Sequence, residues 1–317
     1  MNRILVIRGG AIGDFILSLP ALKALREAHS HVRLEILGYR HIALLAENRF
    51  YAQAVRSIEY GALSSFFAKN AKLPAEIGNY FAGFDLIISY LYDPDGIFEM
   101  NLRRCGVEDL VCGPARIENS VHAARQLAKP VEELGIDVVD LGARVFPSAE
   151  DWEFAREFLR DLPRPIFAIH PGSGSEKKTW PLQNWISIGD HLLRSDKFRG
   201  SLVVTSGEAD QGQVGKLEPL WQGQRVVFAE NLPLPLLAAV FAQTIFIGHD
   251  SGISHLAAAT GAKCILLFGP TDPDVWAPRN ENVSVIRSKT GALEGIDIAQ
   301  VEYAIAAPLC EGRRQGF

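Results

Sequence analysis

The 317-residue sequence predicts an α/β protein with two domains, each built on a parallel β-sheet. Three observations support this prediction. Short apolar runs that end in Gly or Asp alternate with longer segments of helical period. The alternation restarts after residues 162–165, where two prolines suggest a joint. The length also suits two domains of about 150 residues each, and we expect these domains over 1–150 and 151–317.

The N-terminal half begins with an apolar strand over 3–8 and continues with a helix over 15–28, in which leucine and alanine recur on one face. Further buried strands are expected over 32–37 and 84–90. Because the chain starts with a strand and not with a basic region followed by an apolar leader, we expect no export.

The C-terminal half repeats this style. An amphipathic helix over 149–160 leads into the proline pair. Apolar runs after it predict strands over 166–170, 202–205, 226–228, 245–247 and 264–268. This half is therefore expected to form a second parallel sheet with crossover helices.

Composition excludes several classes of function. A formal net charge of −5 offers no basic surface for phosphates, so no nucleic-acid partner is expected. The four cysteines form no CxxC pair, which favours reduced thiols in the cytoplasm. The apolar stretch 234–248 contains Pro235 and Gln243 and is shorter than the roughly 20 residues that span a bilayer. We expect a cytoplasmic monomer with at most peripheral membrane contact.

The segment RGGAIGD at 8–14 lies between the first strand and the first helix. Gly10 and Gly13 would let the backbone turn tightly and approach a ligand, next to the unpaired N–H groups of a helix start. Arg8 stands where a dinucleotide fingerprint needs Gly, so that fingerprint is only half satisfied. Asp14 is either a helix cap or a carboxylate at the carboxyl edge of the sheet, where open α/β sheets hold ligands.

The segment HPGSGSEKK at 170–178 follows a predicted strand. The N–H groups and hydroxyl of Gly172, Ser173 and Gly174 can surround phosphate oxygens, and Lys178 supplies positive charge. This combination suits a diphosphate. Glu208, after the strand over 202–205, is either a solvated loop acid or an acceptor for ribose hydroxyls.

The segment GHDSGISH at 248–255 opens an apolar helix. Asp250 or Ser251 can cap this helix, Gly252 permits close approach, and the positive end of the helix favours phosphate. His255 is either a core histidine or a ligand contact. The segment FGPTDP at 268–273 is interpreted as a turn because of its two prolines.

Taken together and in order, five segments resemble glycosyltransferase family nine, typified by the ADP-heptose:lipopolysaccharide heptosyltransferases: RGGAIGDFILSLPALKALR, HPGSGSEKKTWPLQNW, SGE, GHDSGISHLAAA and LFGPTDPDVWAP. The resemblance runs to about residue 278. It implies a GT-B fold, in which two Rossmann-like domains face each other across a cleft. It also implies that the N-terminal domain binds the acceptor and that a C-terminal helix, over about 297–307, crosses back to it.

The resemblance further implies inverting, metal-independent chemistry. Asp14 would be the general base for the acceptor hydroxyl, with Gly10 and Gly13 in the acceptor-side loop. Donor-binding roles are implied for Gly172, Ser173, Gly174, Lys178, Glu208, Asp250, Ser251, Gly252 and His255. His249 replaces a more usual small or amide residue.

No metal or other cofactor is expected, since the nucleotide sugar is a substrate. Residues 93–95 and 272–274 both spell DxD, the acid pair by which some glycosyltransferases hold a divalent metal. Those enzymes have a single-domain fold without a Gly/Ser phosphate loop, so metal binding is disfavoured here.

Three other functions stay open at this point. They are a sugar-nucleotide epimerase of similar architecture, a non-catalytic sugar-nucleotide-binding protein, and an NAD-dependent oxidoreductase with Glu35 at the ribose. The sequence identifies neither the nucleotide base nor the donor sugar and acceptor. A lipid-linked saccharide acceptor would place the enzyme at the inner face of the cytoplasmic membrane.

Overall fold

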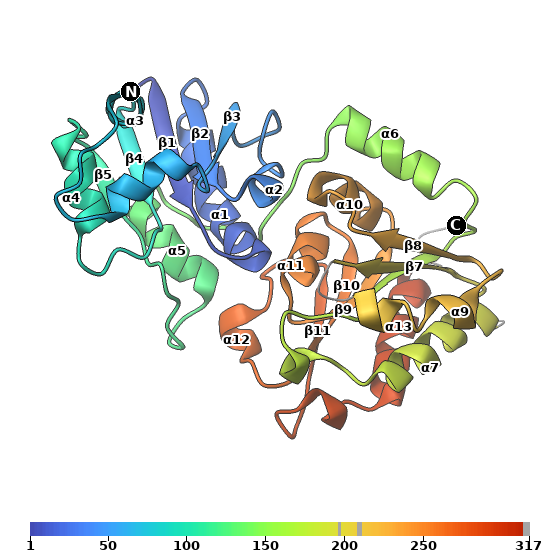
Figure 1. The fold of residues 1–317 in the computed structure, drawn as a ribbon. Coiled ribbons are helices and arrows are strands. Elements are labelled where there is room, and N and C mark those ends of the chain that lie inside the picture. Colours follow the sequence, from blue (N-terminus) through green and yellow to red (C-terminus); the bar gives the residue numbers. More distant parts are fainter. Residues whose placement is uncertain (196–197, 208–210, 313–317) are drawn as a thin grey trace. The chain divides into compact units, whose positions relative to one another are not determined.

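The computed structural model describes residues 1–195, 198–207 and 211–312, which form two compact units, Met1–Leu141 and Gly142–Phe317 (Figure 1). The division precedes helix α6 (Ala149–Phe158), which packs against α10 (Leu234–Phe241) in the second unit. Residues 162–165, which the sequence suggests as a joint, therefore lie inside the second unit. Arg164 holds them there through hydrogen bonds to the backbone and side-chain oxygens of Gln243.

The first unit is built on a five-stranded parallel sheet of order β3-β2-β1-β4-β5. Its strands are β1 (Arg3–Arg8), β2 (Arg33–Gly38), β3 (Ala54–Ser57), β4 (Leu86–Ser89) and β5 (Leu110–Cys112). Its helices are α1 (Ile12–Ala28), α2 (Arg40–Ala43), η1 (Gly61–Phe67), α3 (Ala75–Ala82), α4 (Ile97–Arg104) and α5 (Ala123–Glu132). The strand order reverses between β1 and β4, and this reversal is the point at which open α/β sheets hold ligands.

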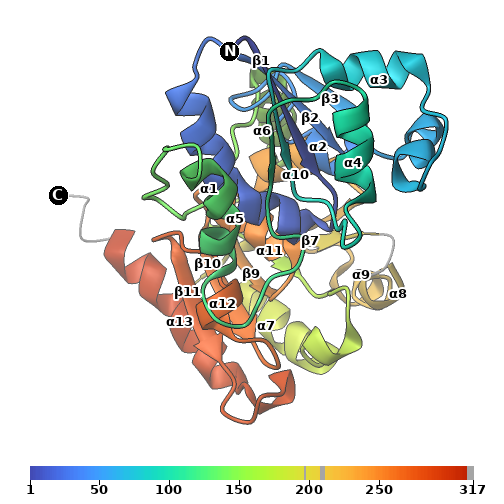
Figure 2. The same cartoon turned by 90° about the vertical axis from the view of Figure 1, so that its left-hand side faces the viewer.

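Helices cover both faces of this sheet. Side chains of β1 and β2 on one face, such as Leu5 and Leu37, join a buried cluster with Phe66, Phe81 and Phe98 from η1, α3 and α4. Figure 2 shows α1 and α5 on the opposite side of the strands. Because both faces are covered, the central strands are buried along almost their whole length.

The second unit is built on a six-stranded parallel sheet of order β11-β10-β9-β6-β7-β8. Its strands are β6 (Ile166–His170), β7 (Ser201–Ser206), β8 (Val226–Glu230), β9 (Ile245–His249), β10 (Lys263–Phe268) and β11 (Val283–Arg287). Its further helices are η2 (Glu176–Lys178), α7 (Leu182–Arg194), α8 (Gln211–Val214), α9 (Glu218–Trp221), α11 (Gly252–Ala259), α12 (Pro273–Trp276), η4 (Leu293–Gly295) and α13 (Ile298–Gly312). Here the order reverses between β6 and β9.

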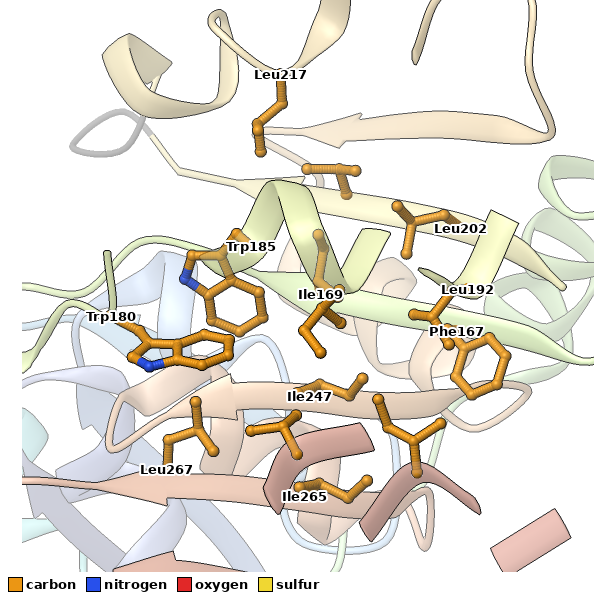
Figure 3. Packing of buried hydrophobic residues seen from close by; sticks show 14 of the residues in the cluster. Phe167, Ile169, Trp180, Trp185, Leu192, Leu202, Leu217, Ile247, Ile265 and Leu267 are labelled. Carbon is orange, nitrogen blue, oxygen red and sulfur yellow. The ribbon is translucent and has the colours of Figure 1, made fainter. Parts of the chain in front are cut away.

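One face of the second sheet packs against α7, α9 and α13 in a cluster that contains three buried tryptophans: Trp180, Trp185 and Trp221. Figure 3 shows Trp180 and Trp185 in this cluster. The other face meets α10 and α11, where the rings of Phe241 and Phe246 lie 5.0 Å apart. The two apolar faces fix the register of the strands. That register determines which residues reach the edge of the sheet.

The predicted α/β architecture with two parallel sheets is confirmed, and the predicted strands correspond to β1, β2, β4 and β6–β10. The first helix begins at Ile12 and not at residue 15, so it includes Asp14 in its first turn. The edge strands β3, β5 and β11 were not predicted, because their apolar runs are short or interrupted by polar residues and the strands are only partly buried.

Helix α13 (Ile298–Gly312) occupies the region of the predicted C-terminal helix. Val301 and Ile305 are fully buried in the core of the second unit. The crossing of this helix to the first domain stays a prediction. No helix among the described residues is long and apolar enough to span a bilayer.

Candidate functional site

The carboxyl edge of the second sheet gathers two of the predicted motifs at the reversal of strand order. Strands β6 and β9 are hydrogen-bonded neighbours, with His170 paired to Gly248 at their carboxyl ends. The Gly/Ser loop (residues 171–178) follows β6, and Asp250 and Ser251 follow β9 directly. Both segments therefore emerge side by side at the position where open α/β sheets bind ligands.

The Gly/Ser loop offers a set of polar groups that become more exposed along the chain. Gly172 is buried, Ser173 is half-buried, and Gly174 is exposed. A Cβ added to Gly174 would meet no atom within 4 Å, so space is open around its backbone. The loop closes in the short 3₁₀ helix η2, where the Lys178 backbone N–H donates to the Ser175 carbonyl at 2.9 Å.

Lys178 and Asp250 are brought into direct contact from segments 72 residues apart. Lys178 Nζ lies 2.7 Å from Asp250 Oδ2, and Thr271 Oγ1 donates to the same oxygen at 2.7 Å. Asp250 is 9% exposed, so its charge is largely shielded from water. The ammonium and the hydroxyl offset the negative charge of this carboxylate, so an anionic ligand can bind next to it.

Thr271 is a site residue that the sequence analysis missed. It lies in the segment interpreted as a turn, between β10 and α12. The chain bends at residues 269–271 and Pro273 begins α12, and this connection carries the Thr271 hydroxyl to the Asp250 carboxylate. Only the position of β10 beside β9 in the sheet indicates that the turn ends at the site.

The N-terminus of α11 is also at this edge. Ser251 is its N-cap, and its hydroxyl accepts a hydrogen bond from Ser254 N at 3.3 Å. This result decides between Asp250 and Ser251 as the predicted cap. Gly252 is the first helical residue, so the first-turn N–H groups and the positive end of the helix add to the charge of Lys178.

His249, the last residue of β9, is fully buried. Its Nε2 accepts a hydrogen bond from the Trp180 backbone N–H at 2.9 Å, and its Nδ1 lies 3.3 Å from the Gly172 carbonyl oxygen. Burial lowers the pKa of this imidazole to about 3, against a smaller opposing effect of the bond to Gly172. The side chain is therefore a neutral imidazole at physiological pH.

For two predicted donor-binding residues, contact with a ligand stays a prediction. His255 is 5% exposed in the second turn of α11, which is compatible with a core role, and its contact with a ligand stays a prediction. Glu208 lies outside the described residues, so its proposed contact with ribose stays a prediction as well.

The carboxyl edge of the first sheet presents Asp14. Gly10 adopts a φ of +93°, which favours glycine, and a Cβ there would lie 2.7 Å from Asp14 Oδ2. Asp14 is the third residue of α1 and not its N-cap. Its Oδ2 accepts the Ala11 N–H at 2.8 Å, and its side chain stays 37% exposed. Gly13 lies one residue earlier in the same helical turn.

Arg8 holds the helix turn that carries Asp14. Its guanidinium donates to the Asp14 carbonyl oxygen from Nε at 3.2 Å and from Nη2 at 2.8 Å, and Nη2 lies 3.8 Å from Asp14 Oδ1. The Arg8 side chain is 4% exposed and lies over the ring of Tyr90. Burial lowers the pKa of Arg8, while the Asp14 carboxylate opposes this shift. Arg8, which stands where the dinucleotide fingerprint needs Gly, is thus a buried residue that holds Asp14 in place.

The first acid of each DxD segment has another role in the structure. Asp93 accepts the backbone N–H groups of Phe98 and Glu99 at the start of α4, and Asp272 is the N-cap of α12. Among the described residues, no group of three or more His, Cys, Asp or Glu side chains could hold a metal ion.

Comparisons with known proteins identify the family of this chain. The family model of glycosyltransferase family 9 (heptosyltransferase) matches residues 112–303. Lipopolysaccharide heptosyltransferase 3 of Escherichia coli is 24% identical over 301 residues, which are 86% of this chain and 84% of the relative. Lipopolysaccharide heptosyltransferase 2 of Salmonella typhimurium is 27% identical over 145 residues, covering 43% of this chain and 40% of the relative.

Solved structures share the fold. A family 9 glycosyltransferase from Veillonella parvula matches with a TM-score of 0.79 at 19% identity, covering 98% of this chain and 97% of the other. The E. coli ADP-heptose lipopolysaccharide heptosyltransferase II matches with a TM-score of 0.78 at 16% identity, covering 99% and 100%. These similarities establish the predicted GT-B type of fold. This chain belongs to glycosyltransferase family 9 and is a glycosyltransferase that uses a nucleotide-sugar donor.

Proposed function

We propose that this enzyme transfers heptose from ADP-heptose to a lipopolysaccharide-type saccharide acceptor, with inversion at the anomeric carbon and without a metal ion. One observation carries the proposal. Lys178 of the Gly/Ser loop is bonded to Asp250, and Asp250 lies directly before the N-cap of α11. The named relatives include heptosyltransferases of lipopolysaccharide, and one solved relative, the E. coli heptosyltransferase WaaC, was determined with ADP. These names support the choice of donor sugar and nucleotide.

The donor diphosphate is assigned to the carboxyl edge of the second sheet. The Gly/Ser loop and the first turn of α11 follow neighbouring strands at this edge, and N–H groups of such loops and helix starts bind anions. Lys178 is held by Asp250 before any ligand arrives, so its ammonium loses little freedom when phosphate binds. We assign Ser173 and the backbone of Gly172 and Gly174 to the same diphosphate, and Glu208 to the ribose.

Asp14 is assigned to the acceptor hydroxyl. Its carboxylate is partly exposed at the carboxyl edge of the first sheet, while Arg8 and the Ala11 N–H fix its orientation. A general base needs such a fixed position more than a large number of contacts. Gly10 leaves the space beside Asp14 Oδ2 free of a side chain.

The reaction is a single displacement. The acceptor oxygen forms a bond to the anomeric carbon while the bond from that carbon to the diphosphate oxygen breaks. The proton of the acceptor hydroxyl passes to Asp14, and ADP leaves with the electron pair of the broken bond. Lys178 and the positive end of α11 stabilise the charge that grows on the diphosphate.

One assay tests the proposal. The purified enzyme is incubated with ADP-heptose and a heptose-deficient lipopolysaccharide core, in parallel with UDP- and GDP-sugars, and released nucleoside diphosphate is measured. We expect release of ADP only with acceptor present, an inverted anomeric configuration of the product by NMR, and unchanged turnover in EDTA. Conversion of the donor without acceptor would indicate an epimerase, and donor binding without ADP release would indicate a non-catalytic binding protein.

If the acceptor is lipid-linked, the enzyme works at the inner face of the cytoplasmic membrane. We propose peripheral contact for this purpose, through the acceptor itself. Sedimentation with vesicles that contain the acceptor, compared with vesicles that lack it, tests this point.

A further inference from the structure

His249 occupies a position on the core-facing side of β9, where an apolar residue is expected. Residues of β9 alternate between the two faces of the sheet, and Ile247 points into the core under α7 and α13. His249 is two residues further and points to the same face, where its ring lies 5.0 Å from the ring of Trp185 in a T-shaped arrangement. A polar ring in this core must satisfy both of its nitrogens.

Both ring nitrogens are satisfied by one loop. Nε2 accepts the Trp180 backbone N–H at 2.9 Å, and Nδ1 lies 3.3 Å from the Gly172 carbonyl oxygen. A carbonyl only accepts, so Nδ1 carries the proton and donates to Gly172. The imidazole thus links residue 172, near the start of the Gly/Ser loop, to residue 180, two residues beyond its end, and Ser173, Gly174 and Lys178 lie between them.

The next residue of the same strand end adds a third link. The Asp250 carboxylate accepts a hydrogen bond from Lys178 Nζ. The consecutive residues His249 and Asp250 therefore bind Gly172, Lys178 and Trp180. Trp180 is fixed on its other side as well, because its indole Nε1 donates to the Ile296 carbonyl at 3.1 Å. The loop is therefore held to the sheet by these side-chain bonds in addition to its own 3₁₀ backbone hydrogen bond.

We propose that His249 is a positioning residue, which holds the Gly/Ser loop in the shape that receives the diphosphate of the donor. This inference rests on the proposed function for the identity of the ligand. Holding the loop in advance lowers the entropy lost on binding, which raises affinity without any contact between His249 and ligand. It also explains why a histidine is accommodated in an apolar core position that an aliphatic side chain would fill.

Three variants separate the two bonds. In His249→Asn the amide nitrogen takes the place of Nδ1 and keeps the bond to Gly172, and in His249→Gln the amide oxygen takes the place of Nε2 and keeps the bond to Trp180. His249→Phe fills the volume of the ring and removes both bonds. Ile247→Val is the matched control, because it loosens the same face of the same strand and leaves both hydrogen bonds of His249 in place.

The first measurement is the Kd for ADP by titration calorimetry, with thermal melting recorded for each variant. We expect the Kd to rise at least tenfold in His249→Phe and by a smaller factor in His249→Asn and His249→Gln, with acceptor KM unchanged. In Ile247→Val we expect a lower melting temperature with an unchanged Kd. An unchanged Kd in a folded His249→Phe protein would overturn the proposal, as would an equal rise in Kd in Ile247→Val.

The second measurement needs no variant to fold. Long-range ¹H–¹⁵N NMR of histidine-labelled wild-type protein reports the tautomer of each ring. We expect the His249 ring to carry its proton on Nδ1 and to stay neutral from pH 5 to 8, because the lowering of its pKa by burial, and by nearby His170, outweighs the raising effects of the bond to Gly172 and of Asp250. A proton on Nε2, or titration near pH 6.5, would overturn the proposal. Failure of the wild-type protein to bind ADP would instead refute the proposed function. The NMR result would then still report whether His249 holds the loop.

Discussion

The two sheets of this enzyme share one topology but prepare their carboxyl edges in different ways. In the second unit, segments after β6, β9 and β10 are joined by direct bonds among Lys178, Asp250 and Thr271. In the first unit, the proposed base after β1 is a single carboxylate, Asp14, which is supported by Arg8 and the Ala11 N–H. The comparison suggests that the second edge is preorganised for binding a charged ligand, whereas the first keeps one acid accessible for chemistry.

The largest effect is expected for Asp14→Asn. The amide keeps a hydrogen-bond acceptor for Ala11 N–H but cannot take a proton, so turnover should fall by about 100-fold or more, with the Kd for ADP within about twofold of wild type. Steady-state kinetics and calorimetry measure the two quantities. Asp85→Asn is the control, since Asp85 also binds backbone N–H groups of the first unit, at Asn2 and Arg3. Near-normal turnover in Asp14→Asn would remove the base from the mechanism.

The next effect concerns donor binding. Removing a charge-assisted hydrogen bond costs about 1.5–3 kcal/mol, so Lys178→Ala should raise the Kd for ADP by about 10- to 100-fold. It also leaves Asp250 without its cation beside the anionic ligand. Lys177→Ala provides a matched control, because Lys177 is the exposed neighbour in the same 3₁₀ helix. Equal effects of the two variants would mean that the loop attracts ADP by overall charge alone.

A smaller effect is expected for Arg8→Lys. A lysine keeps the charge but cannot place two N–H groups on the Asp14 carbonyl oxygen, so kcat should fall by roughly tenfold while donor affinity stays unchanged. Arg3→Lys is made in parallel, because Arg3 lies on the same strand and pairs with Glu35 away from Asp14. A rise in donor Kd without loss of kcat would contradict the separation of roles between the two edges.

The smallest effect is expected for Thr271→Val. The change preserves shape and removes one hydrogen bond to Asp250, which is worth about 0.5–1.5 kcal/mol, or roughly a two- to twelvefold rise in the Kd for ADP. Thr260→Val removes a hydroxyl of the same unit, bound to the Ala257 carbonyl at 2.7 Å, and should leave the Kd unchanged. If both variants bind ADP as the wild type does, Thr271 supports only the turn that contains it.

Much of the fold could be predicted from local pattern. Buried central strands such as 3–8 and 166–170 are short apolar runs, and a parallel sheet leaves few other ways to bury them. The start of the first helix was predicted three residues too late, because Asp14 is a good capping residue and Ala11 is a poor one. The edge strand β8 was predicted from its apolar run, whereas the edge strands β3, β5 and β11 were not, because their apolar runs are short or interrupted by polar residues.

The candidate site divides in the same way. Motifs at the ends of strands indicated Asp14, Lys178 and Asp250, because the carboxyl edge of a parallel sheet is where such residues meet a ligand. Thr271 was interpreted as part of a turn, and Arg8 only as a departure from a glycine fingerprint. The roles of Thr271 and Arg8 depend on the groups that they contact in the folded protein, and spacing along the chain does not reveal those contacts.

The sequence by itself determined the strand–helix alternation, the two-domain α/β class and the positions of the glycine turns, because these follow from hydrophobic period and backbone sterics. Tertiary structure alone decided that one carboxylate oxygen of Asp250 serves both Lys178 and Thr271, and that His249 ties together the ends of a loop about seventy residues earlier in the chain. The order of the strands causes this difference. Strands β6 and β9 become neighbours only when the sheet forms, and the residues between them do not indicate this pairing.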